Sequence, residues 1–117
     1  MTTVVNARTG QIVLHDLREA RGPWGKFAGL MLARSLDAAH GLLFRPAQGM
    51  HTHFMRFPID LIYLDDASNV QAIREAMAPW RFDFRSAAAV IEVNAGVARA
   101  SDIQVGDQLR IEGKSLA

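Results

Sequence analysis

The residues best suited to chemistry lie in one short stretch, His51-Thr52-His53-Phe54-Met55. Side chains of a strand point alternately to its two faces, so His51, His53 and Met55 would share a face. Two imidazoles and a thioether are ligands for copper, and the imidazoles alone suit zinc or nickel. A tight site needs a third or fourth ligand, which the sequence does not identify. We therefore expect no metal centre, with Met55 filling the core and both histidines partly exposed and neutral.

Three charged residues, Arg56, Asp60 and Glu92, stand in otherwise apolar segments. An unpaired charge in a buried strand is costly, so we expect the three to form one buried network. A structural ion network is the preferred interpretation, because such networks also perturb pKa values without catalysis. The enzymatic alternative is an acid–base pair of Asp60 with Glu92, whose pKa values are separated by their environments.

Aromatic and arginine residues interleave in the segment Trp80-Arg81-Phe82-Asp83-Phe84-Arg85. Such a pattern can form a stacking platform for a sugar ring or for single-stranded nucleic acid. A surface loop anchored by buried rings is the preferred interpretation, because exposed aromatic surface is uncommon. The segment fits neither a helix nor a strand period, so we expect an irregular connection beside the site.

These residues need a scaffold of strands, which the apolar pattern predicts. Residues 61–64 are four consecutive apolar residues and indicate a central strand buried on both faces. Pro58 should stand at a bend or a strand's first position. Turn residues predict hairpins around residues 8–10 and 65–69. Further strands are expected within residues 4–5, 11–14, 42–44, 51–56, 70–74, 88–93 and 109–112.

Helical signals are weaker and shorter. Residues 16–32 contain helix formers interrupted by glycines and Pro23, which predicts a broken helical connection. Residues 97–101 predict a second short helical piece. The expected fold class is α+β and mostly β, a curled antiparallel or mixed sheet or a half-open β-barrel with one or two short helices. One domain over residues 1–117 is expected.

Composition excludes several classes of protein. Thirteen Lys and Arg against twelve Asp and Glu leave a net charge of +1, which gives no field to attract nucleic acid or anionic lipid. The absence of cysteine excludes disulfides, thiolate metal sites and a cysteine nucleophile. We expect a bacterial-type cytoplasmic protein, because the N-terminus lacks a secretory pattern and no stretch approaches the ~20 apolar residues of a membrane span.

Three blocks of sequence resemble a known family. They are Gly29-Leu30-Met31 with Leu42-Leu43-Phe44, then residues 51–65, and then Val90-Ile91-Glu92-Val93 with Gly96 and Val105-Gly106-Asp107. Together they resemble the DUF192 family, a widespread prokaryotic group of uncharacterised function, over roughly residues 12–112. His53 stands where the family pattern has an aromatic residue. The resemblance implies a small, mostly β domain and supplies no assigned catalytic residue.

The first functional hypothesis is a non-enzymatic ligand-binding or protein-interaction domain with one pocket. Its ligand-binding residues are expected to be His51, His53, Met55, Arg56, Asp60, Trp80 and Glu92. The alternative is a hydrolytic enzyme, metal-dependent through His51 and His53 or acid–base through Asp60 and Glu92. The expected partner is a small molecule or a protein, not nucleic acid or membrane, and no catalytic residue, metal ligand or cofactor is assigned.

Overall fold

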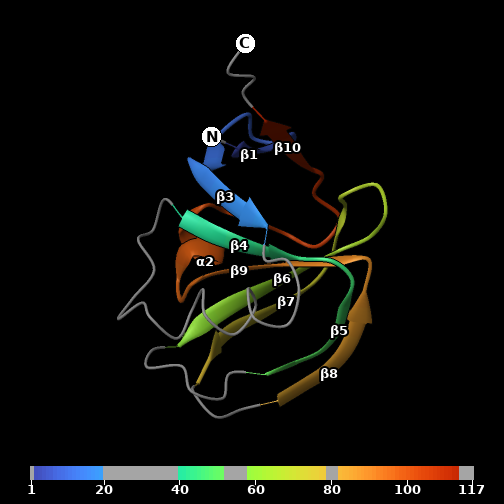
Figure 1. Cartoon of the computed structure of the whole chain (residues 1–117). Coiled ribbons are helices and arrows are strands. Elements are labelled where there is room, and N and C mark those ends of the chain that lie inside the picture. The colour runs from blue at the N-terminus through green and yellow to red at the C-terminus, as the bar shows by residue number, and fades with distance from the viewer. Residues whose placement is uncertain (1, 20–39, 52–57, 79–81, 114–117) are drawn as a thin grey trace.

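Strands dominate the computed structural model of the chain (Figure 1), which describes residues 2–19, 40–51, 58–78 and 82–113. The strands are β1 (Thr2–Asn6), β2 (Ile12–Leu14), β3 (Asp16–Glu19), β4 (His40–Phe44), β5 (Ala47–His51), β6 (Ile59–Leu64), β7 (Val70–Met77), β8 (Phe82–Ala87), β9 (Ala89–Asn94) and β10 (Leu109–Gly113). The helix α2 (Val97–Ala100) has four residues. The expected α+β, mostly β class is confirmed.

The described strands form three sheets, ordered β10-β1-β2, β3-β4-β9-β6-β7 and β5-β8. Neighbours pair antiparallel except β3 and β4, which are parallel, so the five-stranded sheet is mixed. Figure 1 shows the β5–β8 pair bending away from the ends of β4 and β9. The sheets are therefore curled and open, as the sequence predicts.

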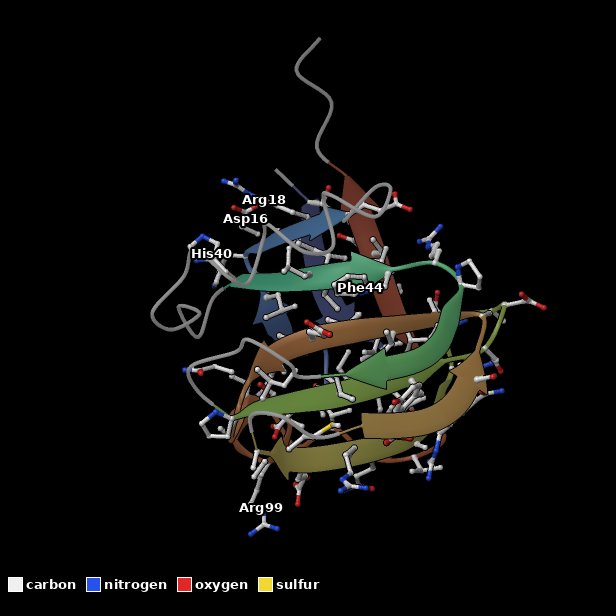
Figure 2. The ribbon with its side chains drawn as sticks, turned by 60° about the horizontal axis from the view of Figure 1, so that its bottom comes forward. Asp16, Arg18, His40, Phe44 and Arg99 are labelled. Atoms are coloured by element: carbon white, nitrogen blue, oxygen red, sulfur yellow. The ribbon has the colours of Figure 1, made fainter. Side chains whose placement is uncertain are left out.

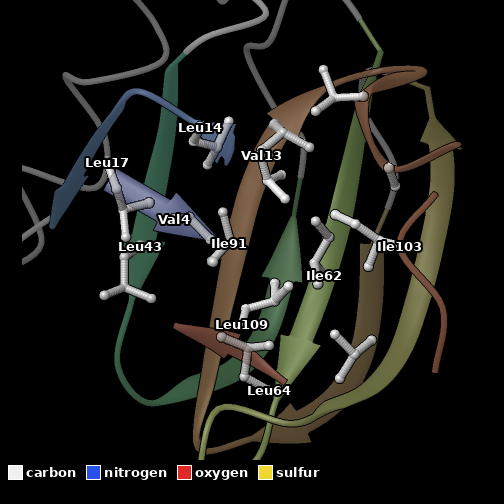
Figure 3. Packing of buried hydrophobic residues seen from close by; sticks show 14 of the residues in the cluster. Val4, Val13, Leu14, Leu17, Leu43, Ile62, Leu64, Ile91, Ile103 and Leu109 are labelled. Atoms are coloured by element: carbon white, nitrogen blue, oxygen red, sulfur yellow. The ribbon is translucent and has the colours of Figure 1, made fainter. Parts of the chain in front are cut away.

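The central strands β6 and β9 are buried on both faces because apolar residues occupy both sets of alternating positions. We call the two faces of the five-stranded sheet the Ile62 face and the Tyr63 face, after residues of β6. On the Ile62 face, side chains of β1, β2, β10 and the segment after α2 gather around Ile62 and Ile91 (Figure 3). On the Tyr63 face, β5 and β8 contribute Ala47 and Ala87 to a second apolar cluster.

Local turn chemistry forms both predicted hairpins. Gly10 takes the φ of 72° that the turn between β1 and β2 requires. The Asp65 carboxylate accepts hydrogen bonds from the amides of Ala67 and Asn69 at 2.9 and 2.8 Å, which fixes the turn between β6 and β7. The predicted strands of residues 42–44, 88–93 and 109–112 are also confirmed, as is the helical piece near Val97.

Two predictions of local structure are wrong. Residues 16–19, expected to begin a helix, form β3, which pairs with β4. The Asp16 carboxylate there lies 3.3 Å from Arg18 Nε and 3.4 Å from His40 Nε2, across the paired strands (Figure 2). Residues 82–85, expected to be irregular, belong to β8. In both segments a partner strand distant in sequence overrides the local preference.

The remaining expectations for residues 20–32, 52–57 and 79–81 lie outside the described residues. No helix in the described part of the chain is long and apolar enough to cross a membrane.

Candidate functional site

Asp60 lies at the start of β6 and is fully buried. Its Oδ1 accepts a hydrogen bond from the amide of Ala76 at 2.7 Å, and its Oδ2 accepts from the amides of Gly96 and Ala98 at 3.0 and 3.1 Å. These amides belong to the end of β7 and the start of α2. Asp60 therefore joins three segments of backbone, and both of its oxygens are already occupied.

Glu92 occupies the middle of β9, opposite Leu61 of β6 and Leu42 of β4. It is 2% exposed, and its Oε2 has no hydrogen-bond partner among the described residues. Burial raises the pKa of this carboxyl to about 8, because the apolar surroundings disfavour the charged form. At neutral pH Glu92 is thus a neutral carboxylic acid held within the protein.

The expected network of Asp60 with Glu92 is wrong. Residue pairing aligns Asp60 with Val93 and Leu61 with Glu92, so the two carboxyl groups project from opposite faces of the sheet. Among the described residues, the hydrogen bonds to Asp60 come from backbone amides and not from a charged side chain. The acid–base pair proposed for these two residues is therefore excluded, and Arg56 lies outside the described residues.

Tyr63 follows Leu61 by two residues and emerges on the same face as Glu92. Its hydroxyl is buried, and no described residue forms a hydrogen bond with it. Burial raises the pKa of the phenol, and the nearby Asp83 carboxylate raises it further although the two groups lack the geometry of a hydrogen bond. The Arg85 guanidinium carbon lies 5.5 Å from the centre of the tyrosine ring.

Asp83 and Arg85 come from β8. Ala87 of the same strand packs against the apolar cluster of the Tyr63 face, and the register of β8 on β5 shifts between Ser86 and Asp83. Asp83 is 9% exposed, and its Oδ1 accepts a hydrogen bond from the amide of Arg85 at 3.0 Å. Glu92, Tyr63 and Asp83 thus lie between the five-stranded sheet and β8. We call these three residues the interlayer polar cluster.

Sequence reasoning identified Glu92 and missed the other two members of this cluster. Tyr63 was hidden in an apolar run, where only its hydroxyl distinguishes it from a core residue. The alternation of residues 82–85, in which two phenylalanines alternate with Asp83 and Arg85, is the signal that could have indicated a strand with a polar inner face.

The strands that precede and follow the other expected site residues are described, and their ends are aligned in two pairs. His51 ends β5 and is aligned with Phe82 at the start of β8, and Ile59 at the start of β6 is aligned with Met77 at the end of β7. The segments 52–57 and 79–81 therefore connect neighbouring strand ends. The side chain of His51, and the residues His53, Met55, Arg56 and Trp80, lie outside the described part of the chain.

Two other polar features are less suited to bind a ligand, because their carboxylates already accept hydrogen bonds from within the protein. Asp107 is buried and accepts hydrogen bonds from Arg8 Nε at 2.8 Å and Asn6 Nδ2 at 2.9 Å; the bond from Arg8 is the main cause that lowers the pKa of Asp107 to about 2. A cleft of about 170 Å³ opens beside Arg45 at the far end of β6, but its Asp65 carboxylate is engaged by backbone amides. No group of three metal-ligating side chains occurs among the described residues.

Comparisons with known proteins agree with this fold. The model of the DUF192 family, described as "Uncharacterized ACR", matches residues 4–111. A protein of Thermococcus sibiricus (strain DSM 12597 / MM 739) named UPF0127 protein is 28% identical over 112 residues, which are 91% of this chain and 72% of the relative.

Two solved structures are similar over most of their length. One, from Sinorhizobium meliloti 1021, is provisionally described as a transcription regulator and has a TM-score of 0.78 at 25% identity, covering 94% of this chain and 91% of that one. The other, a protein of unknown function from Novosphingobium aromaticivorans DSM 12444, has a TM-score of 0.74 at 24% identity, covering 93% and 82%. The curled sheet arrangement is thus shared with both of these proteins.

Proposed function

We propose that this chain, which belongs to the DUF192 family, is a non-enzymatic ligand-binding or protein-interaction module whose site includes the interlayer polar cluster. The observation that carries the proposal is Glu92, a nearly fully buried carboxyl group with an oxygen that has no partner in the described part of the chain. The segments that contain His53, Met55, Arg56 and Trp80 are proposed to border the same site, because residue pairing brings the ends of both segments together.

Two buried polar groups of the cluster lack hydrogen bonds from the described residues. A buried polar atom without a hydrogen bond costs about 1–3 kcal/mol, and native proteins contain few of them. Here Glu92 Oε2 and the Tyr63 hydroxyl are both in that state, on one face of one sheet. A ligand that supplies hydrogen bonds to them recovers part of this cost, which gives the protein a physical reason to bind one.

We do not propose the acid–base form of the hydrolytic alternative. Asp60 accepts hydrogen bonds from backbone amides and lies on the opposite face of the sheet from Glu92. Its metal-dependent form rests on His51 and His53 and is tested by the metal content of the purified protein. We therefore place the binding module first.

Nucleic-acid binding is not proposed for this chain. The description of the Sinorhizobium relative concerns that protein, whereas the net charge of this chain is +1. Several of its described arginines lie within 3.6 Å of a carboxylate, which reduces their attraction for phosphates. These are Arg8, Arg18, Arg99 and Arg110.

A thermal-shift screen over sugars, nucleotides, peptides, amines and metals tests the proposal, because a ligand that binds the native state raises its melting temperature. We expect at least one class to stabilise the wild type and to lose its effect in Glu92→Leu. Glu112→Leu, at an exposed position of β10, is the matched control and should keep the response. If every stabilising ligand acts equally on wild type and Glu92→Leu, the site lies elsewhere.

A further inference from the structure

We propose that the ligand of the interlayer polar cluster carries a primary ammonium group on an apolar stem, and that binding it displaces a proton from Glu92. This inference rests on the proposed function, since it names the chemical class that the same site would take.

The charges around the cluster favour a cation. Asp83 is a buried carboxylate whose only hydrogen bond among the described residues comes from the backbone amide of Arg85. No described side-chain cation forms an ion pair with it. Burial raises the pKa of the Tyr63 phenol, and the Asp83 and Glu92 carboxyl groups raise it further, so hydrogen-bond acceptors lie close to the hydroxyl. A ligand with N–H donors and positive charge complements such a space.

The tyrosine ring supplies a second, independent indication. The Arg85 guanidinium already lies over this ring, with its central carbon 5.5 Å from the ring centre. Arg85 itself is exposed, so its charge is largely solvated, although it still lowers the pKa of the Tyr63 phenol. The ring thus already carries a cation on one face, while no described cation forms an ion pair with the carboxyl groups behind it.

The surroundings of Glu92 also define the rest of the ligand. Leu61 and Leu42 are its partners on the two neighbouring strands, and neither carries charge. On the Tyr63 face, the described titratable or charged groups around Glu92 are Tyr63 on β6 and Asp83 and Arg85 on β8. Two exposed arginines lie one strand further out in the same cross-strand row, Arg74 beside Leu61 and Arg18 beside Leu42. An aliphatic stem matches the leucines, and an ammonium head matches the carboxyl groups.

Proton exchange follows from the neutral state of Glu92. The carboxyl O–H bond breaks, the proton passes to the buffer, and the carboxylate formed accepts N–H hydrogen bonds from the ammonium group. Since the pKa of Glu92 is about 8, the carboxylate is the minor form at lower pH. Affinity for the cation should therefore rise about tenfold per pH unit below that value and level off above it. A neutral or anionic ligand that needs the protonated carboxyl shows the reverse dependence.

The test uses three probes that share one four-carbon stem: n-butylammonium, n-butanol and pentanoate. Binding is measured by calorimetry and by thermal shift at pH 6, 7 and 8, in buffers of different ionisation enthalpy, which report the protons released. We expect n-butylammonium to bind preferentially, with affinity rising about tenfold per pH unit and close to one proton released at pH 7. Glu92→Gln keeps the shape and the neutrality of the group and should abolish the pH dependence of affinity and the proton release. Glu112→Gln should preserve both.

The outcomes separate the two proposals. If n-butanol or pentanoate binds preferentially and Glu92→Gln weakens that binding, the ammonium class is wrong and the binding site stands. If n-butylammonium binds with the same affinity at every pH and in Glu92→Gln, the proton exchange is wrong. If Glu92→Gln alters the binding of none of the probes, and the wider ligand screen also shows no dependence on Glu92, both proposals are overturned.

Discussion

Replacing Glu92 with glutamine should change how the stability of the protein depends on pH. The pKa of this carboxyl is raised from 4.5 to about 8 by burial. The folded state therefore holds a proton that the unfolded state releases throughout the interval between these two values. Because the unfolded state binds fewer protons there, the free energy of unfolding falls as pH rises through that interval.

The magnitude follows from the width of the interval. Each pH unit within it lowers the free energy of unfolding by about 1.4 kcal/mol. Between pH 5 and pH 7 the wild type should therefore lose about 2 to 3 kcal/mol that Glu92→Gln does not lose. The glutamine amide also introduces its own donor into the apolar layer, which adds an offset that does not depend on pH. The comparison therefore uses the slope of the free energy of unfolding against pH, and not its absolute value.

The assay is urea unfolding of both proteins at pH 5, 6 and 7, followed by circular dichroism, with linear extrapolation to zero denaturant. Glu112→Gln, which removes an exposed carboxylate from β10, serves as the control and should follow the wild-type slope. Parallel curves for wild type and Glu92→Gln would falsify the claim that Glu92 is buried and neutral.

Four further predictions test the supporting structure. Asp60→Ala removes the acceptor of three backbone amides and should lower the free energy of unfolding by on the order of 3 kcal/mol in urea titration; a loss below about 1 kcal/mol would contradict its structural role. Asp107, whose pKa is lowered to about 2, stabilises the fold above pH 4 and loses this contribution as pH falls toward 2. Asp107→Asn should therefore make the free energy of unfolding depend less on pH in this range, as followed by circular dichroism. An acid transition identical to that of the wild type would refute this role. Gly41→Ala places a Cβ 2.7 Å from Leu14 Cδ1 and should lower the melting temperature, whereas Gly113→Ala, with 3.9 Å to its nearest neighbour, should not. Protein purified without an affinity tag should hold copper or nickel at well below one equivalent after dialysis, and stoichiometric metal measured by mass spectrometry would revive the hydrolytic alternative.

The strands that could be predicted are those whose signals are local. The apolar run of β6, the alternation in β7 and the Gly10 turn each lie within a few consecutive residues. Residues 16–19 could not be predicted as a strand, because their pairing with β4 depends on a segment more than twenty residues away. The same holds for β8, whose partner β5 lies over thirty residues earlier.

The residues of the candidate site could likewise be predicted only where their signal is local. Glu92 was identifiable because a charge in an apolar strand is a local anomaly. Asp60 was identified by the same rule, but its partners are backbone amides at positions 76, 96 and 98, which carry no signature in the sequence. Asp83 and Tyr63 meet across two layers, so their proximity depends on the curl of the sheets and not on any local pattern.

A carbon-13 NMR titration of the Glu92 carboxyl, assigned by comparison with Glu92→Gln, measures the protonation state on which the proposed site depends. In the free protein the signal should titrate near pH 8, and added n-butylammonium should move the midpoint to lower pH. A midpoint near the ordinary glutamate value of 4.5, with or without the ammonium ligand, would contradict both the buried neutral carboxyl and the site built around it.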